Sequence, residues 1–583
     1  MISPAIPRLT EVLAAAVAAA EAEGERLLAE FHRPGGPRGA GAKAPVDEEM
    51  EVRLCAALQR ALPCVFIGEE TGETRYPGPD AIEGWAWIVD PHDATSDFLK
   101  GIRGSSISVG LVRGAVPVLG VVHVPASPDR GRETFAWAEG TGPLRRNGQP
   151  VNCDLRGATL ASGAIVYATA SSALRPVSFS RAVAPARYVA LASVAHRMAR
   201  VAAGDGVATL SIHEVNEYDI AAGAALLRAS GGAVLDFGGK EVKFTGRPGV
   251  IVNGCFAGAP QAAARLARFD WSEAENEVRR ARRTPTGYPK VADAQRLARA
   301  QGCLLGHAIG DSLRLQAPID DARVPGGGES GSQPGEALEM ALALARSMLS
   351  AGRYDTQAAL AAYRAWLASA PTAVGRALRA ALEGSADTAS ESAGSLMRAA
   401  PIGVWAAGDA GRAAAAAHAD SALTHPNPIC GDACAAFAAA VAAGVAGGSR
   451  DAMLRAALAH AAATHAVSPA RSAIERAARG EAARAGAPGA SGVLIVLQDA
   501  FSRLLRAGDF EQALLACAGA VGDAAVAGAL LGAAGGMEAI PRRQVAPVLA
   551  CRPLAEAGAA QPRPMEYWPD DLLEIAEALL RLA

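Results

Sequence analysis

The chain lacks an excess of charge of either sign. Charged residues make up 20% of its 583 residues, and the formal net charge is −3. A nucleic-acid-binding surface concentrates Lys and Arg, and electrostatic attraction to an anionic membrane requires a basic tract. We therefore expect neither nucleic acid nor a membrane as a partner.

Cysteine is too scarce and too scattered for a disulfide framework. The nine cysteines are an odd set, and only Cys430 and Cys434 lie close in sequence. Apart from His425, five residues upstream of Cys430, no second pair follows at the spacing of a zinc site. The pattern fits a reducing compartment, so we expect a cytoplasmic protein without zinc.

Long apolar runs are also missing. Residues 1–32 interleave Glu and Arg with alanine, which predicts an amphipathic helix rather than a signal peptide. The alanine-rich run 435–446 is predicted to be too short and too weakly hydrophobic to cross a bilayer. We therefore expect no segment that spans a membrane.

The length predicts more than one domain, because 583 residues exceed what one hydrophobic core holds. Residues 1–270 alternate helical and strand patterns, and the strand pattern is expected to stop after residues 253–254. Residues 271–292, charged and then broken by Pro and Gly, are expected to form a linker. Residues 293–583 are rich in Ala and Leu at helical spacing, which predicts an all-α domain.

Four acidic residues in short sequence motifs are the main evidence for a functional site in the first half. Asp90 and Asp93 belong to an Asp-Pro-x-Asp turn that ends an apolar strand, and the proline aims both acids at one point. Glu69 follows another short apolar run, and Asp219 opens a predicted helix. Four carboxylates in one site would repel one another unless cations bind, and oxygen ligands of this kind suit Mg²⁺.

These motifs resemble those of the inositol monophosphatase superfamily, whose pattern is G-E-E, then D-P-x-D-G-T, then W-D-x-A-A-G. Here they are Gly68–Glu70, Asp90–Thr95 and Tyr218–Gly223, in the same order. The resemblance covers roughly residues 1–270. It implies an α/β layered sugar-phosphatase-type fold (αβαβα) and a Mg²⁺-dependent, lithium-sensitive phosphatase with two or three ions.

The resemblance also assigns residues to roles. It makes four side chains metal ligands, adds the backbone carbonyl of His92, and gives Thr95 the task of orienting the attacking water with Asp47 as its acidic partner. The amides of Ala94 and Thr95 would hold the phosphate. Three departures are that Thr is missing from the V-T-x-x-D element ending at Asp47, that Ala94 replaces Gly, and that Tyr218 replaces Trp. The four side-chain ligands are Glu69, Asp90, Asp93 and Asp219.

The second half resembles the ADP-ribosylglycohydrolases. Its opening motif G-x-x-x-G-x-A-x-G-D-x-L is Gly302–Leu313, and further matching segments follow in order. Active members hold two Mg²⁺ through T-D-D-T and G-D-x-D-T motifs, which here are Gly335–Leu338 and Gly519–Gly522. Only Asp311 and Glu336 remain as a candidate ligand site, because Asp523 lies one step past the second motif. The supporting segments are 339–345, 394–401, 424–426 and 527–533.

The sequence therefore predicts a phosphomonoesterase for a small phosphorylated metabolite, such as an inositol phosphate, a 3′-phosphonucleotide or a sugar phosphate. The helical half is expected to have lost glycohydrolase activity. It remains open as a scaffold, a holder of adenosine or ADP-ribose, or a surface for a regulatory partner. The alternatives for the whole chain are a bifunctional phosphatase and glycohydrolase, or a non-enzymatic ligand-binding protein. A homodimer also remains open.

Overall fold

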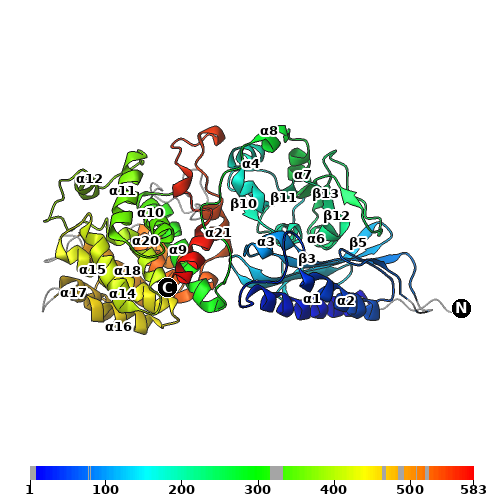
Figure 1. Ribbon diagram of the computed structural model, residues 1–583, viewed down its shortest axis with the longest axis horizontal. Helices are drawn as coiled ribbons and strands as arrows, with labels where there is room; N and C mark the ends of the chain where they lie inside the picture. Colours follow the sequence, from blue (N-terminus) through cyan, green and yellow to red (C-terminus); the bar gives the residue numbers. More distant parts are fainter. Residues whose placement is uncertain are drawn as a thin grey trace. The chain divides into compact units, whose positions relative to one another are not determined.

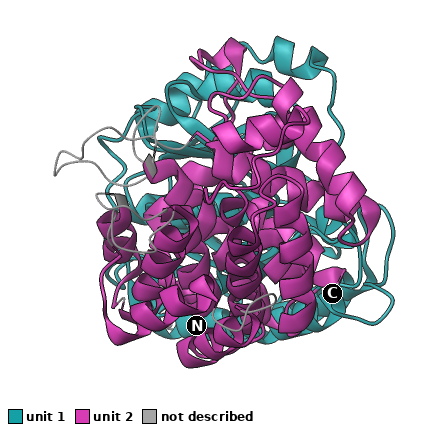
Figure 2. Ribbon diagram, turned by 90° about the vertical axis from the view of Figure 1, so that its left-hand side faces the viewer, with its two compact units in different colours: residues 1–281, 286–290 teal, residues 282–285, 291–583 magenta. Residues whose placement is uncertain are grey.

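The computed structural model describes residues 8–76, 78, 81–314, 333–461, 468–483, 492–506, 508–518 and 524–582 (Figure 1). The chain divides into two compact units, drawn in two colours in Figure 2. Unit 1 comprises residues 1–281 and 286–290, and unit 2 comprises residues 282–285 and 291–583.

Unit 1 combines helices with three sheets, of eight, five and two strands. Its helices are α1 (Leu9–Phe31), α2 (Pro45–Ala61), α3 (Thr95–Leu99), α4 (Pro176–Val183), α5 (Val194–Ala202), α6 (Glu217–Ala229), α7 (Pro260–Ala267) and α8 (Ser272–Asn276). The strands of its larger sheet are β1 (Val65–Gly68), β2 (Gly72–Thr74), β3 (Trp85–Asp93), β4 (Ser106–Arg113), β5 (Val116–Ser127), β6 (Gly131–Ala138), β7 (Arg145–Arg146) and β8 (Gln149–Pro150). The remaining strands are β9 (Ile165–Thr169), β10 (Arg187–Leu191), β11 (Ala208–Ser211), β12 (Val215–Asn216), β13 (Ala233–Leu235), β14 (Ile251–Val252) and β15 (Cys255–Gly258).

The elements of unit 1 stack in five layers (Figure 1). Helices α1 and α2 cover one face of the eight-stranded sheet, whose order is β2-β1-β3-β4-β5-β6-β7-β8. Helices α5 and α6 lie between it and a five-stranded sheet of order β10-β9-β11-β15-β13, whose other face carries α4 and α7. The αβαβα fold implied by the sequence resemblance is confirmed.

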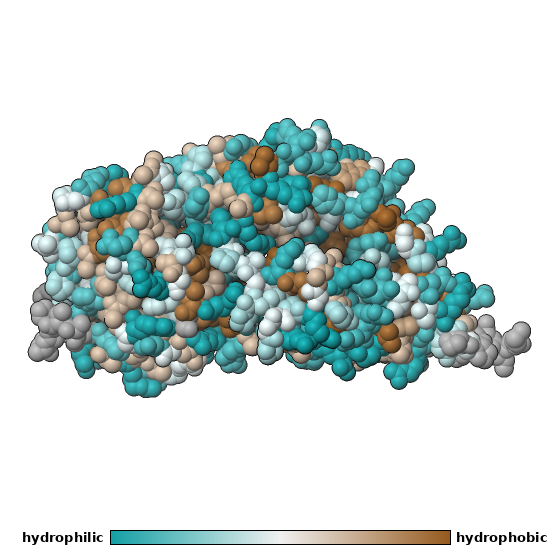
Figure 3. Space-filling view, in the orientation of Figure 1, coloured by the Kyte–Doolittle hydropathy of each residue, from teal (hydrophilic) through white to brown (hydrophobic). Residues whose placement is uncertain are grey.

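Helix α1 shows why the first layer forms. Its apolar residues recur at helical spacing, and Val12, Ala16, Ala20, Leu27 and Phe31 are buried against the sheet. The outward side of α1 and α2 is mostly hydrophilic in the space-filling view (Figure 3). The predicted amphipathic helix is confirmed for its described residues, while residues 1–7 lie outside them.

Two glycines of the large sheet bring α6 close to it. A Cβ on Gly120 would lie 2.3 Å from the carbonyl oxygen of Ala222, and one on Gly110 would lie 2.8 Å from the Cβ of Ala221. Only residues without a side chain allow the helix backbone to approach this near. The contact fixes α6, and with it Asp219 in its first turn, over strands β3 to β5.

One sequence expectation for unit 1 is wrong. The strand pattern does not stop after residues 253–254, because β15 follows at once and pairs antiparallel with β11 and β13. All four residues of β15 are buried, so they show no alternation of polar and apolar side chains. Asn147 and Gly148 form the tight turn between β7 and β8, with positive φ at both residues.

Unit 2 is helical, and its described part contains no strand. Its helices are α9 (Ala294–Arg314), α10 (Glu336–Ala351), α11 (Thr356–Ala368), α12 (Arg376–Leu382), α13 (Ala400–Trp405), α14 (Ala410–Ala422), α15 (Pro428–Val445), α16 (Arg450–His460), α17 (Pro469–Arg479), α18 (Gly492–Arg506), α19 (Phe510–Ala518), α20 (Ala524–Gly535), α21 (Arg542–Leu549) and α22 (Leu572–Arg581). The predicted all-α half is confirmed.

Glycines also set the closest helix pair of unit 2. A Cβ on Gly306 of α9 would lie 2.2 Å from the carbonyl oxygen of Gly528 in α20, and one on Gly532 would lie 1.9 Å from that of Gly302. The two backbones are therefore in direct contact. The glycines of the opening motif are explained by this packing.

Helix α15 corrects the expectation for the alanine-rich run. The helix begins at Pro428, so its 18 residues are long and apolar enough to cross a membrane by length and composition. However, 83% of this 18-residue helix is buried inside the unit, where α15 packs against α14 and α16. Its apolar character is that of a core helix.

Candidate functional sites

The acid-rich turn sits where strand β3 leaves the regular sheet. Asp90 pairs with Ser108 of β4 and Asp93 pairs with Ser106, with a register shift between them. The carboxylate of Asp90 accepts a hydrogen bond of 2.7 Å from the amide of His92. The irregularity turns both acids of the motif out of the pleat and toward the start of α6.

The structure brings Glu69, Asp90, Asp93 and Asp219 together. The charges of the other three acids all act on Asp90. Burial, followed by the charges of the neighbouring acids, raises the pKa of Asp90 and of Asp219 well above the usual range. Glu69 is the exposed member of the cluster. Desolvation by the surrounding protein, followed by the charges of the nearby acids, raises its pKa to about 7. The cluster thus holds more negative charge than its surroundings neutralise.

Three acids of the cluster, Asp90, Asp93 and Asp219, accept hydrogen bonds from backbone amides. The carboxylate of Asp93 accepts hydrogen bonds from Ser193 Oγ (2.6 Å) and from the amide of Ala195 (2.8 Å). Asp219 accepts from the amide of Asn216 in a capping box at the start of α6 (2.7 Å). These contacts fix the carboxylates before any ligand arrives.

The turn that carries Glu69 is held by Glu51 of α2. This fully buried carboxylate accepts from the amides of Glu70 (2.9 Å) and Thr71 (2.7 Å). It lies directly over Gly68, where a Cβ would come within 2.1 Å of Glu51 Oε1. The glycine of the G-E-E motif is therefore required by this close approach.

Asp47, His92 and Thr95 form a second, connected group beside the acids. Thr95 Oγ1 lies 3.3 Å from Asp47 Oδ2 and 2.8 Å from the carbonyl oxygen of His92. His92 Nδ1 lies 2.7 Å from Asp47 Oδ1. Ala94 adopts a left-handed conformation (φ 76°) and begins the five-residue helix α3. Asp47 and Thr95 thus meet, as the sequence assignment requires.

Sequence reasoning missed three residues of this region. Ser193 and Glu51 hold the acids as described above. Arg197 is buried and donates to the carbonyl oxygens of Leu191 (2.9 Å) and Ala192 (2.6 Å), which fixes the segment that leads into Ser193. Its only sequence signal is a charged residue at an apolar helix position of α5.

No group of three or more His, Cys, Asp and Glu side chains among the described residues has the arrangement of a ready metal site. The acids of the cluster in unit 1 nevertheless lie close enough to raise one another's pKa values. Among the described residues, Cys430 and Cys434 are likewise not part of such a group. All nine cysteines are free thiols.

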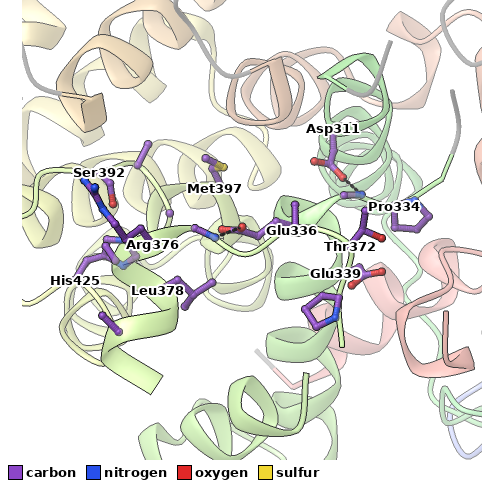
Figure 4. A pocket seen from close by; sticks show the side chains of 18 of the residues that line it. Asp311, Pro334, Glu336, Glu339, Thr372, Arg376, Leu378, Ser392, Met397 and His425 are labelled. Carbon is purple, nitrogen blue, oxygen red and sulfur yellow. Dashed lines mark hydrogen bonds between the residues drawn. The ribbon is translucent and has the colours of Figure 1, made fainter. Parts of the chain in front are cut away.

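Unit 2 contains a cavity of about 820 Å³ (Figure 4). Asp311 of α9 and Glu336 of α10 both line it, so the structure brings the two acids predicted for this half to one cavity. His425 lies in the wall, and burial lowers the pKa of this imidazole to about 3. The lining of the cavity therefore includes a neutral imidazole as well as acids.

The acids of this cavity already have hydrogen-bond partners (Figure 4). Asp311 accepts from the amide of Gly335 (2.6 Å), just before α10, and Glu336 accepts from the amide of Gly375 (2.6 Å). Glu339 forms a two-pronged ion pair with Arg563, with distances of 2.7 and 2.8 Å. The second degenerate motif, residues 519–522, and Asp523 lie outside the described residues.

Behind the cavity lies a buried ion pair. Arg398 donates to Asp420 Oδ2 (2.8 Å) and to Thr424 Oγ1 (2.9 Å), and Thr424 Oγ1 lies 2.8 Å from His425 Nδ1. Arg398 is thus a satisfied interior group, in line with a structural role for its motif.

Comparison with known proteins separates the same two halves. Residues 8–273 match the inositol monophosphatase family. The chain is 34% identical over 172 residues to the fructose-1,6-bisphosphatase/inositol-1-monophosphatase of Thermotoga maritima, a match that spans 29% of this chain and 63% of that protein. It is 30% identical over 213 residues to inositol monophosphatase 2 of Solanum lycopersicum, spanning 34% of this chain and 77% of that protein.

Solved structures were found for each half. The inositol monophosphatase of Anabaena covers 45% of this chain with 95% of its own length, at 22% identity and a TM-score of 0.36. An ADP-ribosylglycohydrolase-related protein complex covers 49% of this chain with 99% of its own, at 27% identity and a TM-score of 0.38. Residues 292–583 match the ADP-ribosylglycohydrolase family. The chain therefore belongs to the inositol monophosphatase family, a family of metal-dependent phosphatases, through its N-terminal half and to the ADP-ribosylglycohydrolase family through its C-terminal half.

Proposed function

We propose that unit 1 is a Mg²⁺-dependent phosphomonoesterase for a small phosphorylated metabolite. Inositol phosphates, 3′-phosphonucleotides and sugar phosphates are the candidate substrates. The observation that carries the proposal is the cluster of four acids with raised pKa values, placed next to Asp47 and Thr95. Such a cluster is a cost to folding unless it binds cations.

The donor set fits Mg²⁺. It consists only of oxygens, from the four carboxyls and the backbone carbonyl of His92, and divalent cations would displace the protons that the raised pKa values of the carboxyls favour. When bound, the cations would neutralise the nonbridging phosphate oxygens and lower the pKa of a water. Two or three ions are consistent with this number of ligands.

The remaining steps belong to side chains and amides of the chain. The single hydroxyl proton of Thr95 can be donated to the His92 carbonyl oxygen (2.8 Å) or to Asp47 Oδ2 (3.3 Å); donated to Asp47, it leaves the lone pairs of the hydroxyl to orient a water for in-line attack. The amides of Ala94 and Thr95 hold the phosphate. The left-handed conformation of Ala94 turns the chain sharply here, so both amides are available at the start of α3.

A panel of about twenty phosphate esters, assayed with the full chain and Mg²⁺, tests this proposal, because ligand pockets discriminate by shape. We expect hydrolysis of at least one ester, its loss in excess EDTA, and its loss in Asp93→Asn. The matched control is Asp154→Asn, which changes an exposed acid whose carboxylate accepts hydrogen bonds from Arg156. Activity that survives EDTA, or equal activity of the two variants, would refute the metal assignment.

We further propose that the cavity of unit 2 binds a ligand without glycohydrolase turnover. The absence of turnover is supported by two observations. Asp311 and Glu336 accept backbone hydrogen bonds, and Glu339 is paired with Arg563. Two acids so engaged do not form a binuclear Mg²⁺ site. The full chain should release no ADP-ribose from a modified protein, while calorimetry with ADP-ribose tests binding. Release that disappears in Glu336→Gln or Asp311→Asn would refute the proposal.

We also propose that the protein is located in the cytoplasm. Nine free thiols, seven of them buried, persist in a reducing compartment. A homodimer stays a proposal as well, and sedimentation of the full chain tests it.

A further inference from the structure

His92 uses its side chain as well as its backbone. It is the variable residue of the Asp-Pro-x-Asp motif, and the sequence assigned only its carbonyl oxygen a role. Its imidazole is inaccessible to solvent and points to Asp47, 45 residues earlier in the chain. An edge-to-face contact with Phe98, at 4.4 Å between ring centroids and 89° between planes, fixes the orientation of the ring.

The carboxylate of Asp47 joins two groups. Its Oδ1 lies 2.7 Å from His92 Nδ1, and its Oδ2 lies 3.3 Å from Thr95 Oγ1. Because an ionised carboxylate only accepts, Nδ1 carries the proton of the shorter bond. The other ring nitrogen, Nε2, is buried and has no hydrogen-bond partner in the described structure. The ring is thus oriented entirely by Asp47 and Phe98.

The contact to Thr95 is too long to orient Asp47 by itself. A hydroxyl-to-carboxylate hydrogen bond is normally near 2.6 Å, and a contact of 3.3 Å leaves the carboxylate free to rotate. The bond from His92 is short, involves a charged acceptor, and lies away from solvent, so it sets the rotation of the Asp47 carboxylate. It thereby keeps Oδ2 facing Thr95.

We propose that the His92 side chain is a positioning residue of the phosphatase site: through Nδ1 it holds Asp47 so that Oδ2 of this carboxylate faces the Thr95 hydroxyl. The inference rests on the proposed function of unit 1. It adds a third member to the pair predicted from sequence, and it gives the motif's variable position a chemical role. His92 does not contact substrate, because its polar ring atoms face the interior of the unit.

Three substitutions separate this role from packing. In His92→Asn the amide nitrogen stands as many bonds from Cβ as Nδ1 does, so the bond to Asp47 is retained. In His92→Gln the amide lies one bond further, near the position of the partnerless Nε2. His92→Leu fills the space without any donor. Positioning predicts that Asn retains more activity than Leu, whereas packing alone predicts the reverse, since a buried amide costs more than an apolar side chain.

Steady-state kinetics on the best ester of the panel provides the first measurement. We expect His92→Leu and His92→Gln to lower kcat about 10- to 100-fold with KM changed less than about twofold, as for an interaction felt mainly in the transition state. His92→Asn should recover most of the loss. In an Asp47→Asn background, His92→Leu should lower kcat no further. Leu retaining as much kcat as Asn, or additive losses in the double variant, would overturn the proposal.

A stability measurement keeps the inference independent of the proposed activity. Urea unfolding of the wild type, His92→Leu, Asp47→Asn and the double variant forms a double-mutant cycle without any metal or substrate. We expect clearly non-additive midpoint shifts, because either single change leaves one partner buried and unsatisfied. Additive shifts would overturn the contact itself. If no ester is hydrolysed while the cycle is non-additive, the proposed function fails and the His92–Asp47 contact stands without a catalytic role.

Discussion

Ser193→Ala tests how the protein holds Asp93. The Ser193 hydroxyl donates to Asp93 Oδ2 at 2.6 Å and accepts from the amide of His196 at 2.9 Å, which makes it the N-cap of α5. It also lies 2.8 Å from Ser106 Oγ. Since Ser193 has a single proton and gives it to Asp93, Ser106 is the donor of that third bond. Removing one oxygen therefore breaks three hydrogen bonds.

The magnitude follows from two of these bonds. Loss of a Ser cap costs about 1 kcal/mol, and loss of a hydrogen bond to a charged group costs about 1.5–3 kcal/mol. The free energy of unfolding should therefore fall by about 2.5–4 kcal/mol when Asp93 is ionised. The amide of Ala195 still holds Asp93 Oδ2 at 2.8 Å, so Mg²⁺ binding should weaken by about tenfold rather than disappear.

Two variants isolate the contribution of Asp93. Ser449→Ala removes a comparable Ser cap from α16, where Ser449 accepts from the amide of Ala452 at 3.2 Å and contacts no carboxylate. It should lose only about 1 kcal/mol of stability and leave the Mg²⁺ dependence unchanged. Ser193→Thr keeps the hydroxyl and should resemble the wild type. The assays are urea unfolding and the Mg²⁺ concentration at half-maximal activity. Equal effects of Ser193→Ala and Ser449→Ala would refute the reasoning.

Three further predictions concern stability. Gly306→Ala should lower the melting temperature by several degrees, because its Cβ would meet a backbone carbonyl of α20 at 2.2 Å, whereas Gly508→Ala, with nothing within 4 Å, should change it little. Ala94→Gly should stabilise the protein by about 1 kcal/mol in urea unfolding by relieving its left-handed conformation, and a loss would contradict the strain. Burial alone would raise the pKa of Glu133, but Arg200 outweighs it and holds that pKa well below the usual value. Glu133→Gln should therefore be less stable than the wild type at pH 7, and the difference should shrink as the pH falls below about 4.5, when the unfolded state binds the proton first.

The first unit shows how far residue patterns reach. The acid turn after β3 and the acid at the start of α6 were predictable, because both combine a clear local pattern with chemistry that has few structural uses. Strand β15 was not, since its four residues are buried on both faces and have no alternation. The positions of Ser193 and Arg197 depend on the packing of α5 between two sheets, which no local pattern encodes.

The side chain of His92 illustrates the same limit within a recognised motif. The motif fixed the backbone of His92, and therefore its carbonyl oxygen, but its partner lies 45 residues away on α2. Only the packing of α2 against β3 brings Asp47 to the ring. A contact of this kind between distant segments could be found only in three dimensions.

The acid cluster of unit 1 and the acids Glu339 and Asp420 of unit 2 differ in what balances their charge, and this difference separates a candidate cation site from interior ion pairs. In unit 2, Glu339 is matched by Arg563 and Asp420 by Arg398, so each negative charge has a fixed positive partner. In unit 1, Asp90 and Asp219 lie near other carboxyls, and burial together with the charges of those carboxyls raises their pKa values. A protein gains nothing in stability from leaving such charges unmatched. The acid cluster of unit 1 is therefore where cations are expected to bind. The carboxylates of Glu339 and Asp420 are already paired with arginine and are not left to bind a metal ion.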